Sequence, residues 1–345
     1  MRVGIVTQYK RHDSVGVAMR LADLFEAMNH EVSVYSPNDS RGVPKLRPDW
    51  DRRVVGGQAV TLMEWAEKQD AIVWTEAPPT IDVALANKSG CKTICLAPWG
   101  ELTRHAEASL RFFDVVVVPS LYAANMIAHR YEVTTHIVHW DCGTPVSRKD
   151  VPPGDRVRVL VPLHGTAAGR TEALQVALSM ANLTQWCPWA DITITVTPKT
   201  LPPATFATLR KHVVTGPHGS LSLVYDDTGF ALAPHVFGRH DLTVWPVLYD
   251  GFGTVPLQSL CMGTPVVAFS LNPAREIVAD GRNGLLVDPY TDASELEPNW
   301  RGLEEAMTAV LTEDGALARM AAQTRYLLDH RRMGFRECWI RILQG

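Results

Sequence analysis

The sequence predicts an α/β protein built from two Rossmann-like, doubly wound domains, and three observations support this prediction. Its 345 residues are enough for two domains of ordinary size. Short apolar runs alternate with segments of helical spacing over residues 1–145, and a second such series follows residue 156. Between the two series, residues 148–156 are rich in proline, glycine and charge, as is typical of a linker.

The first domain is expected over residues 1–148. Short apolar runs predict its strands at 2–7, 31–35, 71–74, 93–97, 115–118 and 135–138. Apolar residues at helical spacing predict helices at 16–28, 81–88 and 121–130. This alternation is typical of a parallel sheet.

The second domain is expected over residues 149–325. Its predicted strands are 158–162, 191–196, 221–225, 242–248 and 266–269. Its predicted helices are 171–183, 204–213 and 254–262, and the pattern after residue 289 is helical to the last residue.

Composition excludes several function classes. The chain is 46% hydrophobic and 20% charged with a net charge of -4, and it has no long basic run that would indicate a nucleic acid or an anionic membrane. Residues 1–7 lack the features of a signal peptide, and no segment reaches the ~20 apolar residues of a spanning helix. Six cysteines without a CxxC pair fit a reducing compartment and mostly buried thiols, so we expect a cytoplasmic protein.

The stretch from residue 242 to 289 carries the strongest functional signal. A buried strand is followed by Asp250-Gly251-Phe252-Gly253, and a helix begins at Thr254. Glycines at a strand-to-helix turn let the backbone approach a ligand, and the helix start offers free N–H groups and a positive dipole end. This pattern indicates a nucleotide-type site at the carboxyl end of a parallel strand.

The same stretch resembles the donor-sugar motif of the GT-B glycosyltransferases, above all family 4, the glycosyl transferases group 1. Residues 251–253, 263–267 and 276–287 match that motif nearly letter for letter. Two family glutamates are replaced, by Asp250 and by Gln258. The resemblance implies a GT-B fold, with two Rossmann-like domains facing across a cleft, the donor on the second domain and the acceptor on the first. It also implies that the last helix, 326–345, packs back on the first domain.

The resemblance further implies roles for individual residues. Asp250 would orient the donor sugar. Alternatively, it would serve only as the N-cap of the helix that follows. Gln258 would hold the ribose through a neutral acceptor, or else be a polar residue on an amphipathic helix. Glu276 would contact the donor or serve only in a turn. The remaining donor-binding candidates are the backbone positions Gly16, Gly251, Phe252, Gly253 and Thr254.

Charge that builds up on the departing diphosphate must be neutralised. In GT-B enzymes cationic side chains and helix ends do this instead of a metal, so no metal site and no cofactor are expected, and a UDP-, GDP- or ADP-sugar is the substrate. In the loop where the family has Arg and Lys, this chain has His164 and Arg170. Arg170 would bind the diphosphate, or it could be a solvated residue at the start of a helix. Lys199 and Arg239 are weaker candidates.

Acceptor activation requires a group in the first domain. The family histidine aligns with Trp99, which leaves Glu76 and Glu101 as candidate general bases, each of which could equally be a solvated strand-end residue. His136 and His139 do not indicate zinc, because a three-residue step on a strand points the two side chains to opposite faces. Four tryptophans fall near predicted strand ends: Trp74, Trp99, Trp140 and Trp245. Each ring could stack on a sugar, or it could pack in the hydrophobic core.

These features predict a glycosyltransferase that moves a sugar from a nucleotide-sugar to an unidentified hydroxyl acceptor, with unknown stereochemistry. One alternative is a phage-type DNA glycosyltransferase acting on a hydroxymethylated base, which the missing basic run disfavours. A second is a catalytically silent nucleotide-sugar-binding protein, which the replaced residues favour. A nucleotide-sugar epimerase of the same fold is a third.

Overall fold

In the computed structural model the chain divides into two compact units. The structure describes residues 1–7, 12–37, 54–56, 60–97, 108–140, 155–163, 170–196, 204, 207, 210, 215–216, 219–225, 234–248, 253–291 and 297–345. Unit 1 comprises Met1–Trp140 and Met333–Gly345, and unit 2 comprises Asp141–Arg332. The chain thus divides after residues 140 and 332, where the sequence suggested 148 and 325.

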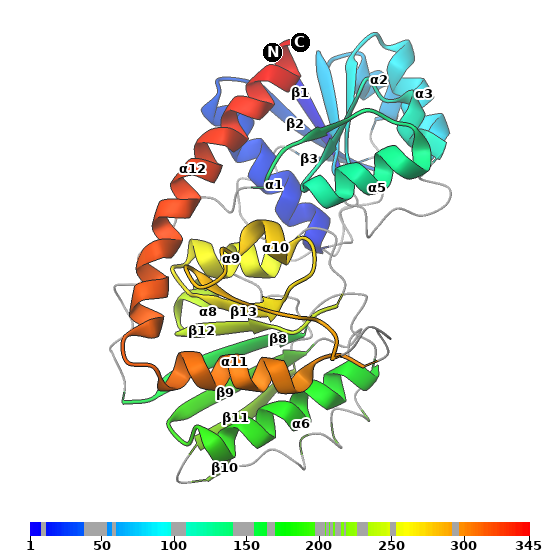
Figure 1. Cartoon of the computed structure of the whole chain (residues 1–345). Helices are drawn as coiled ribbons and strands as arrows, with labels where there is room; N and C mark the ends of the chain where they lie inside the picture. Colours follow the sequence, from blue (N-terminus) through cyan, green and yellow to red (C-terminus); the bar gives the residue numbers. More distant parts are fainter. Residues whose placement is uncertain are drawn as a thin grey trace. The chain divides into compact units, whose positions relative to one another are not determined.

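Unit 1 is built on a parallel sheet of seven strands in the order β3-β2-β1-β4-β5-β6-β7 (Figure 1). Strands β4 and β6 have almost every residue buried, as in parallel sheets that are covered on both faces. The elements are β1 (Arg2–Val6), α1 (His12–Ala27), β2 (Glu31–Ser36), β3 (Val54–Gly56), α2 (Leu62–Ala66), β4 (Ala71–Trp74), α3 (Thr80–Lys88), β5 (Lys92–Leu96), η3 (Leu110–Phe112), β6 (Val115–Val118), α5 (Leu121–Tyr131) and β7 (Thr135–Ile137).

Unit 2 repeats this architecture with the order β10-β11-β9-β8-β12-β13-β14, in which only β10 runs antiparallel to its neighbour. The elements are β8 (Val157–Leu163), α6 (Arg170–Trp186), β9 (Ala190–Val196), β10 (Thr215–Gly216), β11 (Gly219–Tyr225), α8 (Pro234–Gly238), β12 (Leu242–Trp245), α9 (Thr254–Cys261), β13 (Val266–Phe269), α10 (Ala274–Ile277), β14 (Gly284–Val287), α11 (Trp300–Thr312) and α12 (Ala316–Gln344). The predicted α/β class with two doubly wound sheets is confirmed.

The last helix, α12, supplies the end of unit 1. The Trp339 ring is fully buried and meets the Phe25 ring of α1 edge to face, with centroids 5.3 Å apart. Phe335 packs in the same way on Trp140, at 5.2 Å. Lys92 Nζ of β5 donates a hydrogen bond of 2.6 Å to the Ile342 carbonyl, which satisfies a group at the helix C-terminus. Unit 1 is therefore completed by residues that come after unit 2 in the chain.

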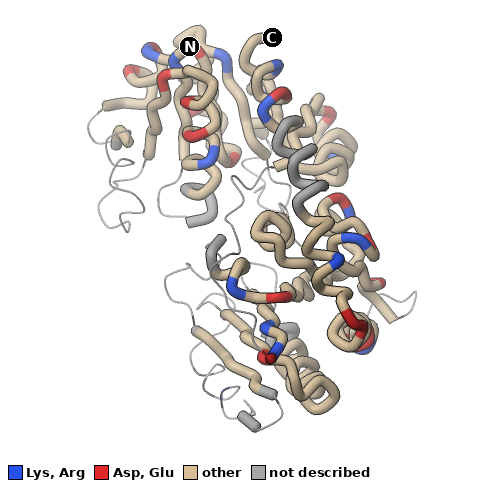
Figure 2. Tube along the Cα trace, turned by 90° about the vertical axis from the view of Figure 1, so that its left-hand side faces the viewer, with Lys and Arg blue, Asp and Glu red and all other residues tan. Residues whose placement is uncertain are grey.

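Charges are arranged in the same way in both sheets. Within the described strands every Asp, Glu, Lys and Arg lies in the first two positions. Figure 2 marks the charged residues of the described chain in blue and red along the backbone. Most of these amino-end charges are paired, as in Arg2–Asp70 at 3.3 Å and Arg158–Asp241 at 3.0 Å. The carboxyl ends carry no strand charge, so polar groups near them come from the connecting segments.

The cysteines differ in part from expectation. Cys91, Cys95 and Cys187 are buried free thiols, and burial raises the pKa of each. Cys338 is also a free thiol, but Cys261 at the end of α9 is disulfide-bonded. Three of the five described cysteines are thus buried free thiols, and the sequence spacing gave no sign of the disulfide at Cys261.

None of the helices in the described part of the chain combines the length and the apolar character that crossing a bilayer requires.

Candidate active site

The candidate site is centred on the connection from β12 to α9 in unit 2. All four residues of β12 are buried between the parallel strands β8 and β13. Asp250, Gly251 and Phe252 lie outside the described residues, and the chain is described again from Gly253, the residue before α9. Gly253 has φ 69° and ψ 30°, a left-handed conformation that favours glycine.

Gly253 also has no room for a side chain. A Cβ atom there would overlap the Cδ1 atom of Ile277 and would stand 2.8 Å from Cγ of Pro273. The backbone before α9 is thus pressed against the segment that forms α10. This contact brings the predicted residues Gly253 and Glu276 into one region, because Glu276 lies in the single turn of α10.

Among the described residues, no side chain caps the N-terminus of α9. Its third residue, Pro256, has no N–H group to satisfy, and the first backbone bond of the helix runs from Leu257 N to Gly253 O at 3.1 Å. The amides of Thr254 and Val255 therefore remain as the donors of the first turn. An uncapped helix start at the carboxyl edge of a parallel sheet is a favourable seat for a phosphate group.

Gln258 lies four residues after Thr254, on the same face of α9 as the start of the helix. The residue is half-buried, and its Oε1 atom is buried without a hydrogen-bond partner among the described residues. Buried side-chain oxygens almost always accept a hydrogen bond. The acceptor is therefore available to a donor group from a ligand, such as a hydroxyl.

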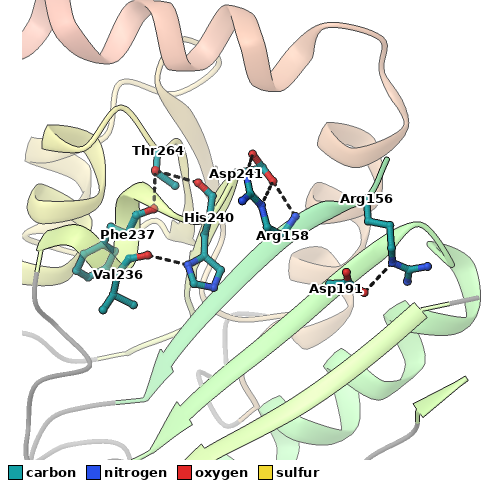
Figure 3. Close-up of polar contacts among 8 residues, drawn as sticks. All are labelled: Arg156, Arg158, Asp191, Val236, Phe237, His240, Asp241 and Thr264. Carbon is teal, nitrogen blue, oxygen red and sulfur yellow. Dashed lines mark hydrogen bonds and ion pairs between the residues drawn. The ribbon is translucent and has the colours of Figure 1, made fainter. Parts of the chain in front are cut away.

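Helix α9 is fixed to the sheet by hydroxyl groups. The Ser259 hydroxyl donates to Thr243 Oγ1 of β12 at 2.8 Å, and Ser259 Oγ lies 2.9 Å from the Thr264 carbonyl. Thr264 Oγ1 lies 3.0 Å from the Phe237 carbonyl and 3.2 Å from the His240 carbonyl (Figure 3). This network holds the helix start in one position relative to β12.

The opposite edge of the same sheet is closed by structural contacts. The Arg158 guanidinium donates to both carboxylate oxygens of Asp241, at 3.0 and 3.2 Å, and Figure 3 shows this pair beside His240. Burial lowers the pKa of His240, whose Nδ1 lies 2.8 Å from the Val236 carbonyl. Arg239 belongs to this amino edge, next to the start of β12. Arg239 as a diphosphate ligand was therefore wrong, since α9 begins at the carboxyl edge.

In unit 1, Glu76 lies two residues beyond β4 at the carboxyl edge. The preceding Thr75 is buried, and its hydroxyl lies 3.1 Å from the Thr7 hydroxyl at the end of β1. Glu76 is half-buried, and its charge contributes, after burial, to the raised pKa of the neighbouring Cys95 thiol. Glu76 is thus a carboxylate at the edge where parallel α/β sheets bind their ligands.

Asp82 is a second carboxylate near this edge, and it was missed by the sequence analysis. It lies in the first turn of α3, and burial raises its pKa. A carboxyl group with a raised pKa is a candidate general base. The sequence gives no signal for it, because acids in the first turn of a helix are common for the sake of the helix dipole.

The second unit contains the segment that decides the family. Residues 223–328 match the family described as Glycosyl transferases group 1, and they include β12, the Gly253 bend and Gln258. This segment is similar to the group 1 glycosyltransferases. The resemblance read from the motifs is confirmed.

Curated relatives of this group 1 segment match only parts of the chain. A D-inositol 3-phosphate glycosyltransferase of Acidothermus cellulolyticus is 30% identical over 193 residues, which are 49% of this chain and 43% of that protein. Another, of Xylanimonas cellulosilytica, is 34% identical over 97 residues, 28% of this chain and 21% of that protein. An alpha-maltose-1-phosphate synthase of Mycolicibacterium smegmatis is 37% identical over 70 residues, 20% of this chain and 18% of that protein. The chain thus spans less than half the length of each of these relatives.

Solved structures extend the comparison to both units. Anabaena HepE in complex with UDP and glucose has a TM-score of 0.70 at 13% identity, covering 99% of each chain. A glycosyltransferase from Rickettsia africae has a TM-score of 0.69 at 11% identity, covering 99% of this chain and 97% of that one. WaaG, a glycosyltransferase involved in lipopolysaccharide biosynthesis, has a TM-score of 0.64 at 14% identity, covering 100% of both chains. The GT-B fold is therefore confirmed for this chain.

Part of the sequence motif shared with the group 1 family has a structural explanation. Asn283 is almost fully buried, and its side-chain oxygen accepts from Ala279 N at 2.8 Å. Asp280 Oδ1 accepts from Leu286 N, also at 2.8 Å. Gly284 starts β14, where a Cβ atom would overlap the Val266 carbonyl. These residues build the turn that attaches β14 to the sheet, so their side chains have a structural role.

The remaining predicted site residues fall into three groups. Gly253, Thr254, Gln258 and Glu276 lie together in the group 1 segment. Glu101 and His164 lie outside the described residues, as does the side chain of Arg170, the first residue of α6. Gly16 is exposed inside α1, which starts at His12 rather than at residue 16, and no atom lies within 4 Å of a Cβ built there. Gly16 is therefore not required by packing within the chain.

The described tryptophans near strand ends are core residues. Trp74, Trp140 and Trp245 are at most 7% exposed, and Trp74 meets Phe113 edge to face at 5.3 Å. Sugar platforms at these three positions are excluded, whereas Trp99 lies outside the described residues. The exposed tryptophans are Trp186 and Trp189, to which the sequence analysis gave no role.

Proposed function

We propose that this chain is a glycosyltransferase that moves a sugar from a nucleotide-sugar donor to a hydroxyl acceptor. The observation that carries the proposal is the buried, unpartnered Oε1 atom of Gln258, on the helix face that begins at the uncapped start of α9. It supports recognition of a ligand that has both a phosphate for the helix start and a hydroxyl for the amide oxygen. A nucleotide diphosphate has both groups.

In this mechanism the bond between the anomeric carbon and the donor phosphate breaks, and a bond to the acceptor oxygen forms. The amides at the start of α9 stabilise the charge that remains on the diphosphate, assisted by the cationic side chain of Arg170 and by His164 as a hydrogen-bond donor. The acceptor proton passes to a carboxylate, for which Glu76, Asp82 and Glu101 are the candidates, or to the departing phosphate. Asp250 orients the sugar hydroxyls. We propose that no metal and no cofactor are needed.

Donor recognition is assigned to unit 2 and acceptor recognition to unit 1. UDP is our first choice of nucleotide, because HepE, which shares the fold, is described in complex with UDP and glucose. GDP- and ADP-sugars stay in the test. We also propose a cytoplasmic location, because four of the five cysteines that the structure describes are free thiols, although Cys261 is disulfide-bonded.

The deciding experiment incubates the protein with UDP-, GDP- and ADP-sugars, with and without candidate hydroxyl acceptors and with EDTA in a parallel series. Release of free nucleotide that depends on an acceptor, together with a glycosylated product, is the expected result. Saturable nucleotide binding without release would instead identify a silent binding protein. A changed sugar on an intact nucleotide would identify an epimerase, and turnover only with hydroxymethylated DNA would identify a DNA-modifying enzyme.

The role of Gln258 is tested with two variants and two ligands. Gln258→Leu removes one neutral hydrogen bond and is expected to weaken UDP binding by about 0.5–1.5 kcal/mol, or about twofold to tenfold. Gln258→Glu supplies a charged acceptor and is expected to bind UDP as tightly as the wild type or more tightly. Neither change should affect UDP that lacks its ribose hydroxyls. Equal losses with both ligands would show that Gln258 acts only through the packing of α9.

A further inference from the structure

A neutral strip of side chains lies on the outer face of α6 and the turn that follows it. The exposed residues recur at helical spacing within about 100° of one another around the helix axis, and a turn residue continues the strip beyond the helix. The opposite face of α6 is buried in the core of unit 2 through Val176, Met180 and Leu183. The neutral strip consists of Gln175, Leu178, Asn182, Gln185, Trp186 and Trp189.

Two aromatic rings are the main feature of the strip. Trp186 is 72% exposed at the end of α6, and Trp189 is 37% exposed in the turn. The indole N–H of Trp189 donates to the Leu311 carbonyl at 3.3 Å, which fixes the ring against α11. Leu178 is 49% exposed and lies about 12 Å before Trp186 along the helix axis. Large exposed apolar side chains gathered on one face are typical of a binding surface.

Charge excludes several kinds of ligand for this surface. Residues 175–190 include no Asp, Glu, Lys or Arg, although 20% of the whole chain is charged. The neighbouring Arg156 is engaged by Asp191 at 2.8 Å and by the Pro188 carbonyl at 2.9 Å. On the adjacent α11, Arg301 pairs with Glu305 at 2.9 Å. The neutral strip therefore offers no charge to a nucleic acid, a phosphorylated peptide or an anionic membrane.

The remaining chemistry of the strip fits a carbohydrate. Gln175, Asn182 and Gln185 alternate with the apolar residues, and each amide can both donate to and accept from a hydroxyl. A pyranose ring has apolar C–H faces that stack on aromatic rings, and hydroxyl groups around its edge that bind amides. An apolar protein helix would leave these amides unsatisfied. A neutral sugar chain satisfies both kinds of side chain.

We propose that the neutral strip binds a neutral oligosaccharide or polysaccharide chain, at a place distinct from the donor site. Trp186 and Trp189 immediately precede β9, which begins at Ala190, so they lie at the amino edge of the sheet. Helix α9 begins at the carboxyl edge, at the other end of the strands. The length of the strip requires several linked sugar units instead of a monosaccharide.

The test measures binding of maltoheptaose, cellohexaose and mannohexaose to the full chain by calorimetry, with glucose and mannose as short ligands. We expect saturable binding of at least one oligosaccharide, and weak or no binding of the monosaccharides. Trp186→Ala is expected to lower that affinity by at least about tenfold, and Trp186→Phe, which keeps a ring, by less. Phe112→Ala, which removes an aromatic ring 49% exposed in unit 1, is the matched control and should change nothing.

Three results would overturn the proposal. The first is that none of the oligosaccharides binds at millimolar concentration. The second is that Trp186→Ala binds them as the wild type does, which would assign the binding to another place. The third is that the wild type does not bind the oligosaccharides but uses Trp186 for another contact. That contact would be either self-association or binding to neutral phosphatidylcholine vesicles. UDP affinity is measured on every variant. Loss of oligosaccharide binding with unchanged UDP affinity concerns the neutral strip alone, whereas absence of UDP binding concerns the proposed donor site.

Discussion

Replacing Gly253 with alanine tests the bend on which the candidate site depends. Alanine in the left-handed conformation costs about 1–2 kcal/mol. Its Cβ atom would also overlap Ile277 and crowd Pro273, and overpacking of this kind costs about 1–3 kcal/mol. The expected loss of unfolding free energy is therefore about 2–5 kcal/mol, and UDP affinity should fall because the start of α9 is displaced.

The assay is urea unfolding followed by far-UV circular dichroism, with UDP binding measured by calorimetry under native conditions. Because the chain has two units, urea unfolding can show two transitions. The transition that Gly253→Ala destabilises should be the one that UDP stabilises. Gly16→Ala is the matched control. Gly16 lies exposed within α1 with open space around it, so alanine there should stabilise by about 0.5–1 kcal/mol.

A double variant separates the two causes. Gly253→Ala combined with Ile277→Ala removes the overlap with Ile277 but keeps the left-handed backbone, so the combined loss should be smaller than the sum of the single losses. If Gly253→Ala costs less than about 1 kcal/mol and leaves UDP affinity unchanged, the described bend and its role at the helix start are both refuted.

Three further predictions concern other parts of the molecule. Arg170→Ala should weaken UDP binding by more than about 1 kcal/mol, measured by calorimetry, and unchanged affinity would remove Arg170 from the site. Trp339→Ala should destabilise unit 1 by about 3–5 kcal/mol in urea unfolding, since its ring is fully buried against Phe25; a loss below about 1 kcal/mol would contradict that packing. Burial lowers the pKa of His240 in the folded state, so its contribution to stability is complete above the unfolded pKa of about 6.5 and is lost as the pH falls towards the folded pKa. His240→Gln should therefore flatten the decline of stability between pH 7 and 5, and an unchanged slope would show that His240 does not titrate on unfolding.

The buried strands could be predicted from sequence because each is a continuous apolar run. The predicted ranges 71–74, 115–118 and 266–269 are the same as those of β4, β6 and β13. Strands β3, β10 and β14 were not predicted. The first two have three and two residues, and β14 begins with a glycine that is needed for the close approach to Val266. Local pattern is weak where a strand is short or lies at the edge of a sheet.

The sequence predicted those features of the candidate site that depend on residues adjacent in the chain. Two glycines before a helix were enough to predict the bend at Gly253. The unpartnered oxygen of Gln258 and the raised pKa of Asp82 depend on neighbours that are distant in the sequence. The same holds for the tryptophans: Trp74 and Trp186 are the same residue type, but one is 1% and the other 72% exposed. Burial of a single residue is set by tertiary packing, which a one-dimensional pattern does not contain.

The return of α12 to unit 1 has a consequence for the order in which this protein matures on the ribosome. Unit 2 is contiguous and can become native before the residues that follow it are made, whereas unit 1 waits for Phe335 and Trp339, which come after unit 2 in the chain. A chain that stops before Phe335 would leave unit 1 incomplete, with the apolar surface around Phe25 exposed and available to chaperones.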